Sequence, residues 1–206
     1  HLGPTYDGNM SAELVGYTDA DWAGCLDTRR STSARIVMFM GAALTWASKQ
    51  QRTVATSSAE AEYTAASDCA REAMWVRKLV ADVMELDSIP VTPILEDNAA
   101  AAKWCYNPLN HAKQKHIDIA YHFIREQVAE FGNLTIVPVP TVDQLADLGT
   151  KALASPRFEY LVRKVFNIAP DRSLRTTATL DMTANSQVHP ALPTPASRHT
   201  DSTEVP

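Results

Sequence analysis

A stripe of apolar residues at helical spacing is the feature that most constrains the fold of this chain. Steps of three and four residues from Glu62 reach only apolar side chains, namely Ala66, Cys69, Ala73, Val76, Val80 and Val83. Residues spaced in this way lie on one face of a helix. We therefore predict a helix from about Ser57 to about Leu86 that buries this face against another layer of the structure.

Short apolar segments before and after this helix predict strands. Three come first, at about 13–19, 35–40 and 44–48, and two follow, at about 91–97 and 134–139. Short turns join the first three, which should be antiparallel, whereas helical segments lead to the last two, which should be parallel. The sequence thus predicts an α/β fold with a mixed five-stranded sheet and flanking helices.

Further helices are predicted at about 98–106, at about 115–131 and from Ser155 to about Phe166. Residues 141–144 match a capping box, which predicts the start of the short helix that carries Asp147. Large aromatic side chains usually contribute to the cores of small domains. We therefore expect the core or the sheet to take up the rings of three tryptophans, Trp46, Trp75 and Trp104.

Composition divides the chain into three parts. The 206 residues are 45% apolar and 21% charged, which suits one globular domain with a sizeable core. We predict this domain at 12–166, after a lead-in segment at 1–11. Residues 167–206 hold five of the 12 prolines, many Ser and Thr, and few large apolar side chains. Such a segment does not bury enough apolar surface to fold, so we predict a disordered tail.

Cysteine usage and apolar run length indicate where the protein is found. The three cysteines, Cys25, Cys69 and Cys105, form no Cys-x-x-Cys pair. This pattern argues against a disulfide framework or a zinc ribbon and favours a reducing compartment. The apolar runs are too short to cross a bilayer. We expect an intracellular protein that does not interact with membranes.

Four carboxylates, Asp19, Glu62, Asp97 and Asp147, fall at predicted strand ends and helix starts. Taken singly, each has an ordinary interpretation as a helix cap or a first-turn acid. Taken together, they form an all-oxygen ligand set. Mg²⁺ is a hard cation that prefers such ligands, so the set indicates a magnesium site.

Two neighbouring pairs of acids offer alternatives for this site. Glu62 heads the apolar stripe, where a carboxylate is costly unless it is paired. Glu60 heads a largely polar stripe, so we expect it to face water and to stay outside the site. Asp19 directly follows an apolar run, whereas Asp21 is interpreted as a turn residue.

The motifs around these acids resemble the ribonuclease H domain of copia-type retrotransposon polyproteins. The matching segments occur in the order of that family and cover about residues 10–166. They are YTDADWAG at 17–24, DTRRSTS at 27–33, SAEAEY at 58–63, EDN at 96–98, KHIDI at 115–119 and QLAD at 144–147. One such motif is weak, but the ordered set is specific.

The resemblance implies a ribonuclease H-like fold and a metal-dependent endonuclease. Such an enzyme cleaves the RNA strand of RNA–DNA hybrids during retrotransposon reverse transcription. The resemblance further implies that Asp19, Glu62, Asp97 and Asp147 are catalytic and bind two Mg²⁺ ions, which Mn²⁺ can replace. The implied partners are the hybrid and a reverse transcriptase domain in cis within the parent polyprotein. The implied location is a cytoplasmic particle or the nucleus.

A basic segment is the predicted nucleic-acid-binding region. The net charge of −5 is unusual for a nucleic-acid enzyme, which generally has a basic face. Lys113, Lys115 and His116 concentrate positive charge and would contact phosphates without reading sequence. An ordinary solvated face explains such a cluster equally well.

Two other functions remain open at this point. The chain is also consistent with a catalytically decayed or repurposed copy that only binds or scaffolds, because Gly149 stands close to Asp147 where the family usually has a bulkier residue. A nuclease of the same fold that acts on DNA is the second alternative. Metal binding and the choice of substrate distinguish these three functions.

Overall fold

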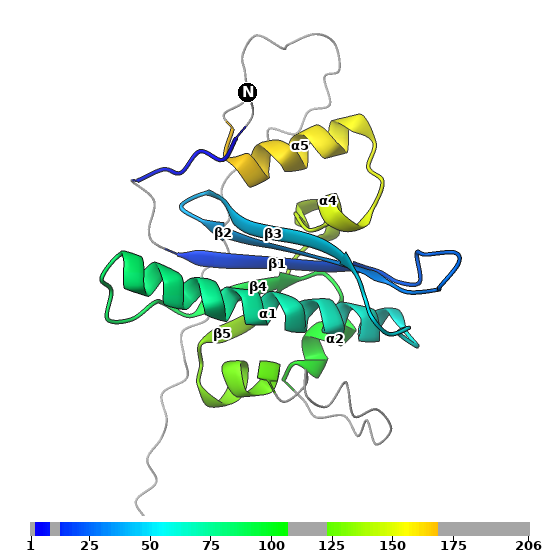
Figure 1. The fold of residues 1–206 in the computed structure, drawn as a ribbon, viewed down its shortest axis with the longest axis horizontal. Coiled ribbons are helices and arrows are strands. Elements are labelled where there is room, and N and C mark those ends of the chain that lie inside the picture. Colours follow the sequence, from blue (N-terminus) through cyan, green and yellow to red (C-terminus); the bar gives the residue numbers. More distant parts are fainter. Residues whose placement is uncertain (1–2, 9–12, 107–122, 169–206) are drawn as a thin grey trace, which may run out of the picture. The chain divides into compact units, whose positions relative to one another are not determined.

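A mixed five-stranded sheet forms the centre of the fold (Figure 1). The computed structural model describes residues 3–8, 13–106 and 123–168. The sheet has the order β3-β2-β1-β4-β5. Its strands are β1 (Leu14–Asp21), β2 (Thr32–Phe39), β3 (Ala42–Gln50), β4 (Thr92–Glu96) and β5 (Leu134–Pro138). The first three are antiparallel, and β4 and β5 continue the sheet in parallel, so the predicted fold class is confirmed.

Helices cover both faces of this sheet. The long helix α1 (Ser58–Val83) packs on β1 and β2 on one face, and α4 (Asp147–Thr150) and α5 (Ser155–Phe166) pack on the other (Figure 1). The shorter elements are α2 (Ala99–Trp104), the π-helical η1 (Glu126–Glu130) and the 3-10 turn η2 (Thr141–Asp143). Among the described residues, no helix has the length and apolar character to cross a membrane.

The apolar stripe of α1 is buried as predicted, apart from its last member. Ala66, Cys69, Ala73 and Val76 are fully buried, whereas Val83 is 73% exposed. The helix packs closely because β1 has a glycine beneath it. A Cβ at Gly16 would lie 2.5 Å from Ile94 Cδ1 and 3.0 Å from Cys69 Sγ. Full burial of each larger apolar side chain contributes about 1.5–3 kcal/mol, so the stripe anchors α1 to the sheet.

The predicted capping box is wrong. Residues 141–143 form the 3-10 turn η2, and α4 begins only at Asp147, without a side-chain cap. Gln144 is fully buried instead. Its amide donates hydrogen bonds to the carbonyl oxygens of Thr18 (2.8 Å) and Leu95 (3.5 Å). Gln144 therefore ties the segment before α4 to β1 and β4, because a buried amide must find partners.

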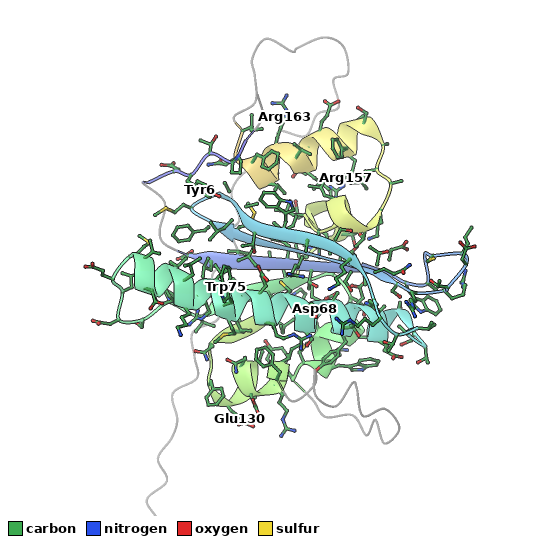
Figure 2. The ribbon with its side chains drawn as sticks, in the orientation of Figure 1. Tyr6, Asp68, Trp75, Glu130, Arg157 and Arg163 are labelled. Carbon is green, nitrogen blue, oxygen red and sulfur yellow. The ribbon has the colours of Figure 1, made fainter. Side chains whose placement is uncertain are left out.

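The prediction for the tryptophans is correct only for Trp104, which packs partly against the core. Trp46 and Trp75 are 61% and 56% exposed. Figure 2 shows Trp75 on α1. The core instead consists mainly of small and aliphatic side chains between the helices and the sheet.

The predicted boundaries at residues 11 and 12 lie outside the described residues, as does the tail from 169 onward.

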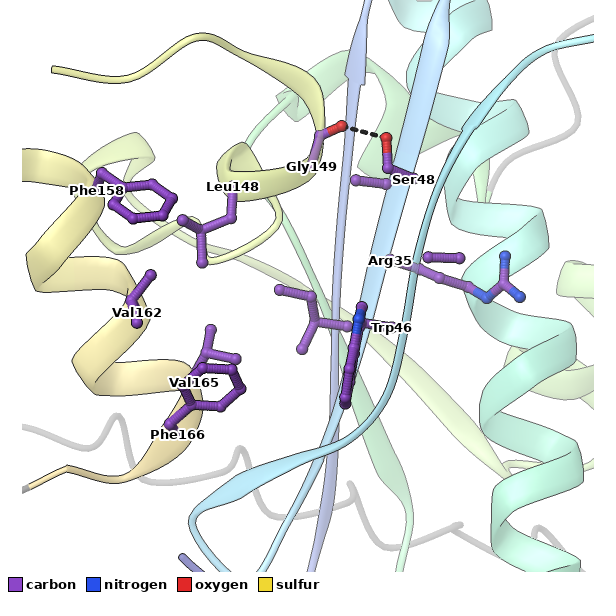
Figure 3. A pocket seen from close by; sticks show the side chains of 12 residues that line it. Arg35, Trp46, Ser48, Leu148, Gly149, Phe158, Val162, Val165 and Phe166 are labelled. Carbon is purple, nitrogen blue, oxygen red and sulfur yellow. Dashed lines mark hydrogen bonds between the residues drawn. The ribbon is translucent and has the colours of Figure 1, made fainter. Parts of the chain in front are cut away.

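Gly149 lies against the sheet at one end of an apolar pocket of about 470 Å³ between α5 and strands β2 and β3 (Figure 3). Its carbonyl oxygen accepts a hydrogen bond from Ser48 Oγ at 2.5 Å. A Cβ on this glycine would lie 2.6 Å from Ala34 Cβ and 3.3 Å from Ser48 Cβ. The short distance to Ala34 shows that a larger side chain at residue 149 does not fit beside this strand.

We expect Gly149→Ala to lower the free energy of unfolding by about 1–3 kcal/mol, because it overpacks the contact with Ala34. Ala34→Gly removes the clashing Cβ at a cost of about 0.5–1 kcal/mol from strand flexibility. The double variant should therefore be more stable than the sum of the two single changes predicts. Denaturant unfolding of the parent and three variants measures this coupling, and strictly additive effects would refute the contact.

Candidate metal-binding site

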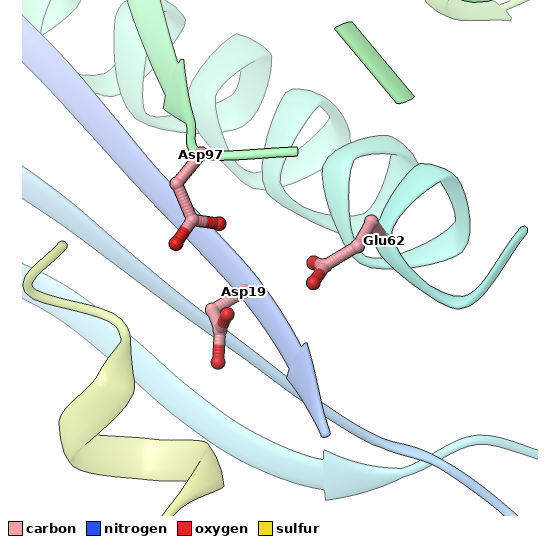
Figure 4. A group of neighbouring side chains, drawn as sticks. All are labelled: Asp19, Glu62 and Asp97. Carbon is pink, nitrogen blue, oxygen red and sulfur yellow. The ribbon is translucent and has the colours of Figure 1, made fainter. Parts of the chain in front are cut away.

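Three predicted acids from distant parts of the sequence converge beside the sheet (Figure 4). Asp19 lies near the end of β1, Asp97 directly follows β4, and Glu62 lies in the first turns of α1. One carboxylate oxygen from each lies within 4.8 Å of the others. Since β1 and β4 are parallel, their carboxyl ends meet at the same edge of the sheet, where α/β sheets commonly bind ligands.

Burial makes this cluster electrostatically costly. Asp19 is 1% exposed and Glu62 is 7% exposed. Burial raises the pKa of Glu62, and the nearby carboxylates of Glu96, Asp19 and Asp97 raise it further. The Oε2 atom of Glu62 is buried without a hydrogen-bond partner among the described residues. A hard divalent cation would supply both the missing partner and the missing positive charge, so this donor set fits Mg²⁺ or Mn²⁺.

The fourth predicted acid, Asp147, is not part of this three-carboxylate group. Its side chain is 6% exposed, and both of its oxygens are engaged by cations. Lys151 Nζ lies 2.6 Å from Oδ1, and Arg157 Nη2 lies 3.4 Å from Oδ2. The same Lys151 Nζ lies 3.1 Å from Asp19 Oδ1. The structure therefore links Asp147 to the group through a shared lysine.

Asp19 is held in place from α4. Thr150 Oγ1 donates a hydrogen bond to Asp19 Oδ2, while Lys151 engages Oδ1. Burial raises the pKa of Asp19, whereas the Thr150 hydrogen bond and the Lys151 charge lower it. Neither Thr150 nor Lys151 was predicted as a partner of Asp19. The spacing of four residues between Asp147 and Lys151, about one helical turn, is the sequence signal that points to Lys151.

A further acid, Glu96, lies beside the cluster. Glu96 is fully buried. Its Oε1 accepts a hydrogen bond from the Asn98 backbone N–H at 2.9 Å, whereas Oε2 has no partner among the described residues. Burial raises its pKa, and Asp97 and Asp19 add to the effect. Strand alternation could have found Glu96, because Thr92, Ile94 and Glu96 all lie on one face of β4 and are all buried.

The expectation that Glu60 faces water is wrong, because its side chain is 6% exposed. Glu60 Oε2 accepts hydrogen bonds from the backbone N–H of Thr56 at 2.8 Å and from its hydroxyl at 2.5 Å. Its own N–H donates to Ser57 Oγ at 3.2 Å. Glu60 thus fastens the start of α1 and is not a member of the three-carboxylate group.

The predicted phosphate-contacting residues, Lys113, Lys115 and His116, lie outside the described residues.

The strand order and the acids that gather at the ends of β1 and β4 define this domain as ribonuclease H-like. No protein-family model matches the chain. The chain is 42% identical over 153 residues to the retrovirus-related Pol polyprotein from transposon RE2 of Arabidopsis thaliana. The aligned segment covers 74% of this chain and 10% of that protein. It is 36% identical over 152 residues to the retrovirus-related Pol polyprotein from transposon TNT 1-94 of Nicotiana tabacum. That aligned segment covers 74% of this chain and 11% of the relative.

The chain is therefore homologous to a segment of transposon Pol polyproteins, and it spans about a tenth of the length of these relatives. The resemblance to the ribonuclease H domain of copia-type polyproteins is thereby confirmed. Among solved structures, LC11-RNase H1 in complex with RNA/DNA hybrid aligns with a TM-score of 0.48 and 16% identity, over 67% of this chain and 94% of that one.

Proposed function

We propose that this chain is a metal-dependent endonuclease that cleaves the RNA strand of RNA–DNA hybrids during retrotransposon reverse transcription. The observation that carries the proposal is the convergence of Asp19, Glu62 and Asp97, whose oxygens lie within 4.8 Å of one another. The buried and unpartnered Oε2 of Glu62 supports it, because such an atom requires a cationic or donor partner.

Asp19, Glu62 and Asp97 would hold the divalent ions, with Asp147 beside them. When bound, two such ions supply an activated water and stabilisation of the leaving oxygen. The protein's own residues orient the ligands: Thr150 fixes one oxygen of Asp19, and Gln144 holds the segment before α4 against β1 and β4. Rigid ligands of this kind reduce the reorganisation needed during reaction.

Recognition of the hybrid would depend on its backbone. The wide minor groove exposes the 2′-hydroxyls that distinguish the RNA strand. Lys113, Lys115 and His116 would contribute phosphate contacts that position the hybrid without reading its sequence. A reverse transcriptase domain in cis within the parent polyprotein is the proposed protein partner, in a cytoplasmic particle or the nucleus.

A hybrid-cleavage assay tests this function. We expect the purified chain to cut an end-labelled RNA strand paired with DNA when Mg²⁺ or Mn²⁺ is present, and to stop cutting in chelator. Duplex RNA and duplex DNA of the same sequence should stay intact. Asp19→Asn, purified in the same way, controls for contaminating host nucleases. Comparable cleavage of duplex DNA would identify a DNA nuclease of the same fold instead.

One observation favours a second candidate, a decayed or repurposed module that only binds or scaffolds. Both oxygens of Asp147 are engaged by Lys151 and Arg157, so this acid is already neutralised within the protein. This candidate predicts no cleavage of any substrate by the parent chain, and no dependence of hybrid binding on Mg²⁺.

A further inference from the structure

Lys151 connects two acids that come from different elements. Its ammonium lies 3.1 Å from Asp19 Oδ1 on β1 and 2.6 Å from Asp147 Oδ1 on α4. The two carboxylate side chains are 1% and 6% exposed, whereas the lysine side chain is 40% exposed. The ammonium of Lys151 therefore contacts two buried carboxylates while its side chain remains partly exposed.

This position places the ammonium where a divalent cation would also be attracted. Asp19 belongs to the three-carboxylate group, and one of its oxygens is bonded to Lys151. Two cations that share one carboxylate repel each other, and this repulsion is strong where burial reduces screening. The flexible four-carbon stem of lysine allows its ammonium to leave when a stronger cation arrives.

The balance of charge around the site supports a regulatory role for this lysine. The acids Asp19, Glu62, Glu96 and Asp97 crowd one another, and the Lys151 charge acts on three of them, Asp19, Glu62 and Glu96. Arg157, by comparison, pairs with Asp147 and also donates to the carbonyl oxygens of Thr141 and Val142. Lys151 is thus the partly exposed counter-ion that contacts both Asp19 and Asp147, while Arg157 is anchored to the backbone.

We propose that Lys151 is a built-in counter-ion that competes with divalent metal for Asp19 and Asp147, and so sets the metal concentration at which the site fills. This inference rests on the proposed function, because it assumes a divalent cation at these carboxylates. Lys151 acts here as a positioning residue: it holds β1 and α4 together through the two acids, and it weakens metal binding for the same reason.

Metal titration of the full chain tests this role. We expect Lys151→Met to bind Mn²⁺ about tenfold or more tightly than the parent in calorimetry, because one competing charge is removed. In chelator the same variant should melt several degrees lower, because Asp19 and Asp147 lose the lysine that they share. Added Mn²⁺ should then raise its melting temperature more than that of the parent.

A matched variant controls for net charge. Lys78 is exposed on α1, 16 residues after Glu62, or about 24 Å along the helix axis. Lys78→Met makes the same change in net charge and should leave both Mn²⁺ affinity and melting temperature unchanged. If Lys151→Met does not fold, Lys151→Gln replaces it, since its amide still donates a hydrogen bond without charge.

The outcomes separate this inference from the proposed function. Equal or weaker Mn²⁺ binding by the Lys151 variant, with clear binding by the parent, overturns the inference and leaves the proposed function standing. Binding by neither protein overturns both. Tighter binding by the variant, including the case where only the variant binds, supports the counter-ion role.

Discussion

Replacing Glu62 with Gln should reduce hybrid cleavage by about a hundredfold or more while leaving the fold intact. Loss of a residue that merely supports a metal ligand typically costs 10–100-fold, so loss of a ligand charge should cost at least as much. In chelator the free energy of unfolding of the variant should be about 1–3 kcal/mol higher than that of the parent. The reason is that Glu62 is 7% exposed and is crowded by Glu96, Asp19 and Asp97. Initial cleavage rates and denaturant unfolding measure the two effects.

Glu60→Gln is the matched control, since it makes the same chemical change two residues away on α1. Glu60 bonds to Thr56 and lies outside the three-carboxylate group. Its variant should therefore keep activity within a few-fold and lose about 1 kcal/mol of stability from a weakened helix start. If Glu60→Gln abolishes cleavage and Glu62→Gln does not, the site assignment is wrong. If the parent itself is inactive, the decayed-copy function is favoured.

Replacing Glu96 with Gln should stabilise the protein strongly at alkaline pH. Glu96 is fully buried, and its Oε2 has no partner among the described residues. A glutamate titrates near pH 4.5 in the unfolded chain, whereas burial raises the pKa of Glu96 in the folded protein. Above about pH 4.5 the folded state thus binds more protons than the unfolded state, and the stability of the parent falls as the pH rises toward the raised pKa.

The variant lacks this titration, so we expect it to be more stable than the parent by about 1–3 kcal/mol at pH 8 in chelator. The difference should shrink toward zero below about pH 4.5, where Glu96 is protonated in both the folded and the unfolded parent. The exposed Glu130 provides a control, because Glu130→Gln should change stability by only a few tenths of a kcal/mol at either pH. A constant difference between parent and Glu96→Gln across this range would show that the effect is packing and not ionisation.

Local sequence patterns predicted the elements that carry the site. The stripe from Ala66 to Val80 identified α1 and its buried face, because helical periodicity is a short-range property of the chain. Apolar runs between turn signals identified the strands, and their connections identified which pairs are parallel. Helical periodicity placed Glu62 at the head of the buried face of α1, and the apolar run of β1 placed Asp19 near the end of that strand.

Local patterns misled where a polar side chain found a partner that periodicity does not describe. Glu60 was expected to face water, yet its bonds to Thr56 allow it to be buried at the helix start. Gln144 was expected to support a capping box, yet its amide bonds to Thr18 and Leu95, which are far away in sequence. Burial of a polar group depends on the partners available in three dimensions.

The sequence by itself therefore determined the order and type of the main strands and helices, the buried face of α1 and three of the acids that converge, Asp19, Glu62 and Asp97. Only the tertiary structure decided how those acids are paired. Asp19 and Lys151 are 132 residues apart, and their ion pair exists because α4 packs across the end of β1. Glu96 joins the site because β4 pairs in parallel with β1. Distances of a few ångströms between remote residues set the charge balance of the site, and these distances follow from packing rather than from local propensity.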